Sequence, residues 1–180
     1  MKKLFLLLLL LAACSRGPAG PAPSEVVSDF LAYVQAGEFA EASELVSGGS
    51  PLGFDRVEEE YRRIFEKLSY EHILEETDGS EAFVTLTVTA FDFGLAMEEL
   101  MAEAFYWVFM DITAEELAEM LETSLIATIE SEFAPMLESE VTVRLERSED
   151  GWLIAADDAF ADAVTGGLFS FAEYVGGWQD

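Results

Sequence analysis

The chain has 180 residues, of which 36 are Asp or Glu and 9 are Lys or Arg, so its formal net charge is −27. Hydrophobic residues make up 51% of the sequence and aromatic residues 12%, which is enough apolar material for one folded domain and argues against global disorder. Because phosphate binding needs clustered Lys and Arg, the acidic excess argues against a nucleic-acid-binding protein, and it also opposes electrostatic attachment to anionic lipid.

The N-terminus has the features of a secretion signal. Lys2 and Lys3 precede an apolar run over 4–11, which is too short to span about 30 Å of hydrocarbon as a helix. The run ends in Leu-Ala-Ala-Cys at 11–14, which resembles a bacterial lipobox. That resemblance implies that the chain is cut before Cys14 and that acyl chains on Cys14, such as palmitate, anchor it to the extracytoplasmic side of a bacterial membrane. The alternative is an ordinary secretory signal with an incidental Cys.

The sequence divides into four segments. Residues 1–13 are the predicted lipoprotein signal peptide, and 14–23, rich in Pro, Gly and Ala, are a predicted flexible tether. Residues 24–165 are predicted to form one α+β domain that contains an inserted pair of helices at about 94–134. Residues 166–180 form a C-terminal tail.

Three helices are predicted at the start of the domain. Ser24 is expected to cap the first, whose apolar residues keep a helical spacing until Gly37 ends it. A second helix is predicted over 38–46 and a third over 54–68. The third contains four of the bases, and glutamates one turn before two of them favour a self-paired, solvated face over an anion-binding spot. The four are Arg56, Arg62, Arg63 and Lys67.

Two β-hairpins are predicted, with turns at 77–80 and 148–151, and the helix pair lies between them. Residues 94–110 form the first helix of that pair, and Thr113 with Glu116 forms a capping box that opens the second. Five residues of the second helix are expected to face inward: Leu117, Leu121, Leu125, Ile129 and Phe133. Helices segregated from antiparallel hairpins predict an α+β fold in which the N-terminal helices pack on one face of a curved sheet.

Parts of the domain resemble the nuclear transport factor 2-like superfamily. Residues 26–42 (VVSDFLAYVQAGEFAEA) are similar to its first two helices, and 141–145 (VTVRL) with 151–154 (GWLI) are similar to its final strands. The resemblance implies N-terminal helices on a cone-shaped antiparallel sheet, and the insertion at 94–134 departs from it. The superfamily contains isomerases, dehydratases and non-catalytic binding domains, so the resemblance leaves function open.

His72 is the catalytic candidate, because it is the one histidine in the chain. Its alternation with Tyr70 and Leu74 predicts that the three side chains share one face of a strand. As a general acid or base, partnered by an aspartate such as Asp92, it would serve an isomerase or dehydratase; the alternative is a structural histidine. A single Cys and a single His exclude a disulfide framework, a thiolate zinc site and a two-histidine mechanism.

We predict no metal site among the acidic residues and no cofactor. The best local cluster is Asp157, Asp158 and Asp162, which lacks the spacing of a wrapped calcium loop. The cluster precedes a predicted helix, where carboxylates stabilise the positive end of the helix dipole, and this favours a capping role.

The run FYWVFM at 105–110 is the most apolar of the mature chain, and six such residues cover every face of a helix. Part of it is expected to close the wide end of the cone; the alternative is that Phe105, Trp107 and Phe109 bind an apolar ligand or a partner. With the lipobox, the sequence favours a lipid-anchored, non-enzymatic binding or accessory domain of the cell envelope. The alternatives are the enzyme that uses His72 and an envelope-assembly partner.

Overall fold

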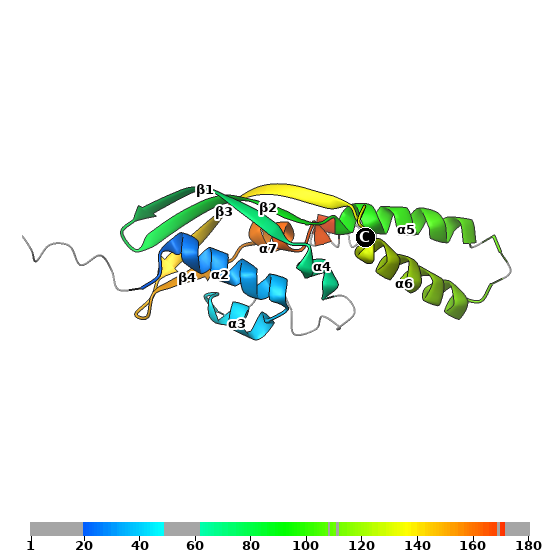
Figure 1. Cartoon of the computed structure of the whole chain (residues 1–180), viewed down its shortest axis with the longest axis horizontal. Helices are drawn as coiled ribbons and strands as arrows, with labels where there is room; N and C mark the ends of the chain where they lie inside the picture. The colour runs from blue at the N-terminus through cyan, green and yellow to red at the C-terminus, as the bar shows by residue number, and fades with distance from the viewer. Residues whose placement is uncertain (1–19, 49–61, 108, 111, 169, 172–180) are drawn as a thin grey trace, which may run out of the picture.

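The computed structural model describes residues 20–48, 62–107, 109–110, 112–168 and 170–171. They form one curved antiparallel sheet, several helices on one of its faces, and a helical hairpin that extends from one end of the sheet (Figure 1). This is an α+β fold with an open antiparallel sheet, and the predicted fold class is confirmed.

The sheet joins both hairpins, because β2 pairs with β3, and its strand order is β1-β2-β3-β4. The helix pair α5–α6 lies between the two hairpins in the sequence, over residues 93–130 where 94–134 is predicted. In chain order the described elements are α2 (Pro23–Ala36), α3 (Phe39–Glu44), α4 (Arg63–Glu66), β1 (Ser69–Asp78), β2 (Glu81–Phe91), α5 (Phe93–Trp107), α6 (Ala114–Glu130), β3 (Met136–Arg147), β4 (Trp152–Ala155) and α7 (Asp158–Val164).

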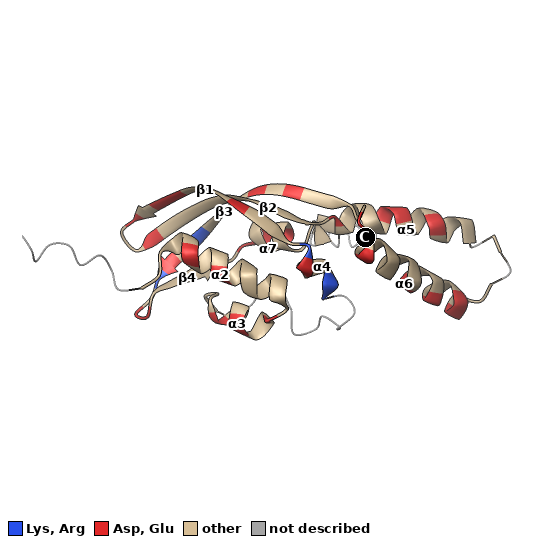
Figure 2. Ribbon diagram, in the orientation of Figure 1, with Lys and Arg blue, Asp and Glu red and all other residues tan. Residues whose placement is uncertain are grey.

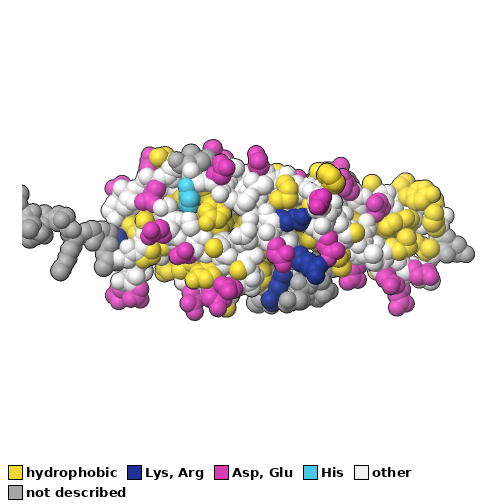
Figure 3. All heavy atoms as spheres, viewed as in Figure 1, with side chains coloured by type: hydrophobic (Ala, Val, Ile, Leu, Met, Phe, Trp, Pro, Cys, Tyr) yellow, Lys and Arg dark blue, Asp and Glu magenta, His cyan; other side chains and the backbone are white. Residues whose placement is uncertain are grey.

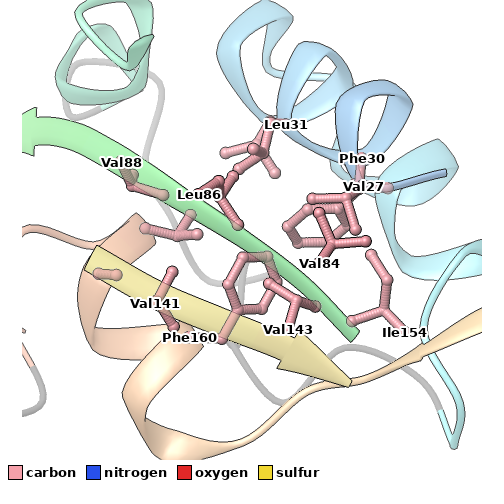
Figure 4. Packing of buried hydrophobic residues seen from close by; sticks show 14 of the residues in the cluster. Val27, Phe30, Leu31, Val84, Leu86, Val88, Val141, Val143, Ile154 and Phe160 are labelled. Atoms are coloured by element: carbon pink, nitrogen blue, oxygen red, sulfur yellow. The ribbon is translucent and has the colours of Figure 1, made fainter. Parts of the chain in front are cut away.

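The main core lies between the sheet and the helices α2 and α7. Along β2 every second residue from Ala82 to Ala90 is buried, as the alternating pattern requires of a strand that is covered on one face. The rings of Phe30 on α2 and Phe160 on α7 meet at 5.4 Å between centroids, and both side chains are fully buried (Figure 4). Large apolar side chains therefore fill the space under the described sheet.

Strand β1 departs from its predicted pattern at one point. The register shifts between His72 and Leu74, so that His72 pairs with Leu86 but Leu74 pairs with Thr85. Because a shift of one residue turns each later side chain to the opposite face, Leu74 lies on the outer face and is exposed. The prediction that Leu74 shares a face with Tyr70 and His72 is wrong.

The start of α2 is also corrected. The helix begins at Pro23, whose fixed φ suits the first helical position, so Ser24 lies inside the first turn instead of capping it. The backbone N–H of Ser24 donates to the Glu75 carboxylate at 2.9 Å, which links α2 to β1. Of the predicted third helix, residues 54–61 lie outside the described residues, and the described part contains α4.

The helix α6 ends earlier than predicted. It stops at Glu130, and Ser131 has extended φ and ψ angles of −63° and 141°. Phe133 therefore leaves the helical repeat, and its side chain is 92% exposed, not inward as predicted. Of the other residues expected to face inward, Ile129 is buried and Leu117, Leu121 and Leu125 are half-buried.

Candidate binding surface

The α5–α6 hairpin is attached to the body through a second, smaller core. Phe91 at the end of β2, Ala96 on α5 and Ile129 on α6 are buried together there. The Asp92 carboxylate accepts a hydrogen bond from the Leu95 N–H at 2.8 Å and so caps the first turn of α5. The base of the hairpin is therefore packed and fixed in direction.

Helix α4 braces the same base from the side. Arg63 forms an ion pair with Glu130 at the end of α6, and Lys67 Nζ donates to the Ser131 carbonyl at 2.9 Å. These two bases thus contact the hairpin; the Glu partner predicted for Arg63, one turn earlier, lies outside the described residues. Arg62 stacks over the Phe39 ring, with its guanidinium 5.6 Å from the ring centroid.

The predicted capping box at the start of α6 is confirmed. The Glu116 N–H donates to Thr113 Oγ1 at 3.2 Å, and the Thr113 N–H donates to the Glu116 carboxylate at 2.7 Å. The hydrogen bond from the Thr113 backbone, followed by that from its hydroxyl, holds the pKa of Glu116 below its usual value. This local network starts the returning helix at the far end of the hairpin.

The free end of the hairpin exposes large apolar side chains. We define the hairpin tip as Phe105, Tyr106, Phe109 and Met110, whose exposed fractions are 69%, 65%, 76% and 47%. The rings of Phe105 and Phe109 meet edge to face at 5.2 Å, so they form one surface. Figure 3 shows hydrophobic side chains gathered at this end of the molecule. Burying one exposed Phe fully is worth about 2 kcal/mol, so the tip can contribute several kcal/mol to binding.

The apolar surface continues along α5 on the side opposite α6. Phe105 follows the buried Leu100 by five residues, which at 100° a residue places it about 140° around the helix from the buried face. Met101, 58% exposed, lies on the same side. We define the α5 outer stripe as Gly94, Glu98, Met101 and Phe105, which have the i, i+4, i+7, i+11 spacing of one helical face.

The α5 outer stripe leads into a groove at the base of the hairpin. The groove has a volume of about 530 Å³ and is lined by Gly94, Glu98 and Met101 from α5 and by Gly167, Ser170 and Phe171 from the chain after α7. Phe171 also contacts Phe93 edge to face, at 6.0 Å between ring centroids. The lining is mainly apolar, and on α5 it extends as far as Met101.

The hairpin is strongly acidic. Residues 93–130 contain nine Asp or Glu and no Lys or Arg. Figure 2 shows acidic residues along both helices of the hairpin, whereas the described bases lie on α4 and near the opposite end of the sheet. The apolar tip is thus combined with a negative potential that attracts cationic groups.

The predicted binding residues fall on this hairpin. Phe105 and Phe109 belong to the tip, whereas Trp107, at the end of α5, is half-buried. Sequence reasoning missed Tyr106, Met110 and Met101. The run at 105–110 pointed to the first two as part of an apolar segment, and the helical spacing of Met101 and Phe105 was the available signal for the stripe.

His72 lies on β1, away from the hairpin, and its side chain is exposed. Its Nε2 is 2.6 Å from Ser28 Oγ, which also lies 2.8 Å from the Ser24 carbonyl oxygen. Its ring also contacts that of Tyr70 edge to face. Asp92 lies six residues beyond Leu86, the partner of His72, which is about 20 Å along the strand. The structure therefore does not bring His72 and Asp92 together.

The acidic cluster at α7 is engaged in local structure. Asp157 Oδ1 accepts from the Phe160 N–H at 2.9 Å and caps α7, and the Asp162 carboxylate accepts from both the N–H and the hydroxyl of Ser170. Across the part of the chain that the structure describes, no group of three or more His, Cys, Asp or Glu is placed to hold a metal ion. Asp157 thus has the predicted capping role.

Cys14 and the lipobox lie outside the described residues, so their prediction rests on the sequence. No helix within the described ranges combines the length and the apolar composition that are needed to cross a bilayer.

No family model matches this chain, and no curated protein matches its sequence. One similar solved structure is described as a calcium/calmodulin-dependent protein kinase type II association domain from Thiobacillus denitrificans; it is 15% identical, with a TM-score of 0.39, and the match covers 77% of this chain and 94% of that one. Another, described as the lipoprotein ycdA of Bacillus subtilis, is 18% identical with a TM-score of 0.43, and the match covers 81% of this chain and 47% of that one. Similarity at this level assigns neither a family nor an activity.

Proposed function

We propose that the protein is a lipid-anchored, extracytoplasmic, non-enzymatic binding domain of the bacterial envelope, and that it holds a partner protein through the α5–α6 hairpin. The observation that carries this proposal is the hairpin tip. Four large apolar side chains stand exposed together at the end of a braced projection. Exposed apolar clusters of this kind are typical of interaction sites, because their side chains contribute no favourable free energy until a partner removes them from water.

The sequence supports the location. The one Cys of the chain stands at the end of the lipobox-like segment, and residues 14–23 have the composition of a tether between a lipid anchor and a domain. Two or three acyl chains at Cys14 would hold the protein at the membrane, since a single chain binds only marginally.

The position of His72 does not favour the enzyme. The groove at the base of the hairpin contains no histidine, and His72 is exposed on the β1 side of the sheet with a serine as its partner. A general acid or base works best where a substrate can be enclosed beside it.

The test of the proposed function is the state of Cys14 in the organism that encodes the protein. The mature protein is purified from membranes, and the mass of its N-terminal fragment is measured. We expect that fragment to begin at Cys14 and to carry acyl chains, and we expect Cys14→Ser to leave the chain unprocessed or released from the membrane. An unmodified N-terminus at another residue, with the protein free of the membrane, would refute the proposal.

A further inference from the structure

We propose that the α5 outer stripe and the hairpin tip dock an amphipathic helix of a partner protein, and that Lys and Arg residues border the apolar face of that helix. This inference rests on the proposed function, because it gives the chemistry of the partner that the hairpin holds. The docking surface consists of Gly94, Glu98, Met101 and Phe105 on α5 together with Tyr106, Phe109 and Met110.

The shape of the surface fits a helix. From Gly94 to Phe105 the stripe spans twelve residues, whose eleven steps make about 17 Å on a helix and match three turns of a second one. Leu100, about 140° around α5 from Phe105, is already buried, whereas Met101 and Phe105 on the outer side are exposed. A third helix laid along the stripe would complete a three-helix arrangement, with its apolar residues against Met101 and Phe105.

The groove at the base gives the docked helix room to approach. Gly94 and Gly167 line it from two sides and have no side chains to hold a neighbouring backbone away. Phe171 and Met101 supply apolar contact within the same groove. The groove reaches Met101, four residues before Phe105, whose ring contacts that of Phe109.

The negative charge of the hairpin determines which residues flank the apolar face of the partner helix. Glu98 stands within the stripe, and residues 93–130 contain nine acids and no base. Lys and Arg beside an apolar face are complementary to this surface and increase the rate of encounter, whereas acidic borders are repelled.

The same charge disfavours two other occupants. A second copy of this chain has a formal net charge of −27 and brings an equally acidic hairpin, so self-docking along the stripe sets like charges against each other. An anionic lipid surface repels the hairpin in the same way, and insertion of the tip would carry the nearby carboxylates toward hydrocarbon.

The test places a photocrosslinker on the surface in living cells. Phe105 is replaced by p-benzoylphenylalanine in the full-length protein of the encoding organism, and the segment that becomes crosslinked is identified by mass spectrometry. Phe133 is replaced in the same way as the matched control, because it is a Phe that is 92% exposed and lies off the stripe. We expect a photoadduct at position 105, stronger than at 133, with a segment whose apolar residues have helical spacing and whose flanks carry Lys or Arg.

Charge reversal provides the second measurement. Glu98→Lys, within the stripe, should lower the yield of the position-105 adduct about threefold or more, whereas Glu122→Lys on α6 makes the same change in net charge and should lower it less. Circular dichroism of both variants checks that they are folded. Equal yields for the two variants would overturn the proposal.

Four other outcomes would overturn the proposal. Three are adducts at position 105 with lipid, with a second copy of this chain, or with a segment that lacks the apolar spacing or has acidic flanks. The fourth is an adduct yield at position 105 no higher than at position 133. Failure of the docking surface is separable from failure of the proposed function. If Cys14 carries acyl chains and position 105 crosslinks a protein segment that lacks the apolar spacing or has acidic flanks, the helix inference alone fails; if Cys14 is unmodified, the lipid anchor of the proposed function fails whatever the crosslink shows.

Discussion

Gly166 connects α7 to the base of the hairpin at a point where the backbone leaves no room for a side chain. Its φ is 62°, and a Cβ there would overlap the Phe91 carbonyl oxygen and lie 2.7 Å from the carbonyl carbon. The Gly166 carbonyl itself accepts from the Phe93 N–H at 2.9 Å. Because Phe91 and Phe93 flank the junction of β2 and α5, neither backbone can move aside without shifting the hairpin. We therefore predict that Gly166→Ala is strongly destabilising.

The magnitude follows from a comparison with Gly79. Gly79 has almost the same φ, 63°, but a Cβ there would meet nothing within 4 Å. The left-handed conformation costs an alanine about 1–2 kcal/mol, and this is all that Gly79→Ala should lose. At Gly166 the overlap adds about 1–3 kcal/mol, as in overpacked cores, so Gly166→Ala should lose about 2–5 kcal/mol.

Urea denaturation measures both losses as free energies of unfolding. The protein for this assay is the mature chain with Cys14→Ser, which carries no acyl chain. Gly166→Ala should unfold at clearly lower urea than Gly79→Ala. Losses within about 0.5 kcal/mol of each other, below the smallest cost of overpacking, would refute the close approach of Gly166 to Phe91.

Three further predictions concern the hairpin and His72. The Thr113 amide resonance in NMR should titrate below pH 4.5, because the pKa of Glu116 is lowered in the folded protein. The cap is therefore intact above the usual Glu pKa and is lost as the pH falls through the pKa of Glu116 in the folded protein. A titration of this resonance that persists in Glu116→Gln would contradict the assignment. A double-mutant cycle of Arg63→Ala and Glu130→Ala should give a coupling of about 0.2–1 kcal/mol that decreases in high salt, because the pair is half exposed; a larger, salt-independent coupling would contradict the geometry. His72→Gln should cost no more than about 1.5 kcal/mol in urea denaturation and leave the Phe105 crosslink unchanged, and loss of the host phenotype in this folded variant would instead favour the enzyme.

The features that could be predicted from the sequence are those fixed by neighbours in the chain. The capping box depends on two side chains three residues apart, Thr113 and Glu116. The alternation over 82–90 predicts a strand covered on one face, and the first hairpin closes with Asp78 opposite Glu81. These local signals suffice for the order of the elements and for the α+β class.

The features that could not be predicted depend on contacts between distant segments. Nothing in the alternation of Tyr70, His72 and Leu74 marks the register shift, because the shift is set by pairing with β2. Phe133 keeps the helical spacing of Ile129, but the helix ends where the chain turns toward β3. In each case the pattern assigns the side chain to a buried face, whereas the structure exposes it.

The candidate surface shows the same limit in its most consequential form. A run of apolar residues indicates that burial is favourable, but it does not say whether this chain provides the cover. For Leu100 the cover is present in the described structure, whereas Phe105 is 69% exposed, although both lie on one helix. The difference arises because Phe105 lies about 140° around α5 from Leu100 and because α5 and α6 extend beyond the end of the sheet, where the described structure places no further layer over that side of α5. Apolar residues that the described part of the chain leaves uncovered, on a hairpin whose sequence contains no base, are therefore the strongest indication of a partner that supplies both the cover and the positive charge.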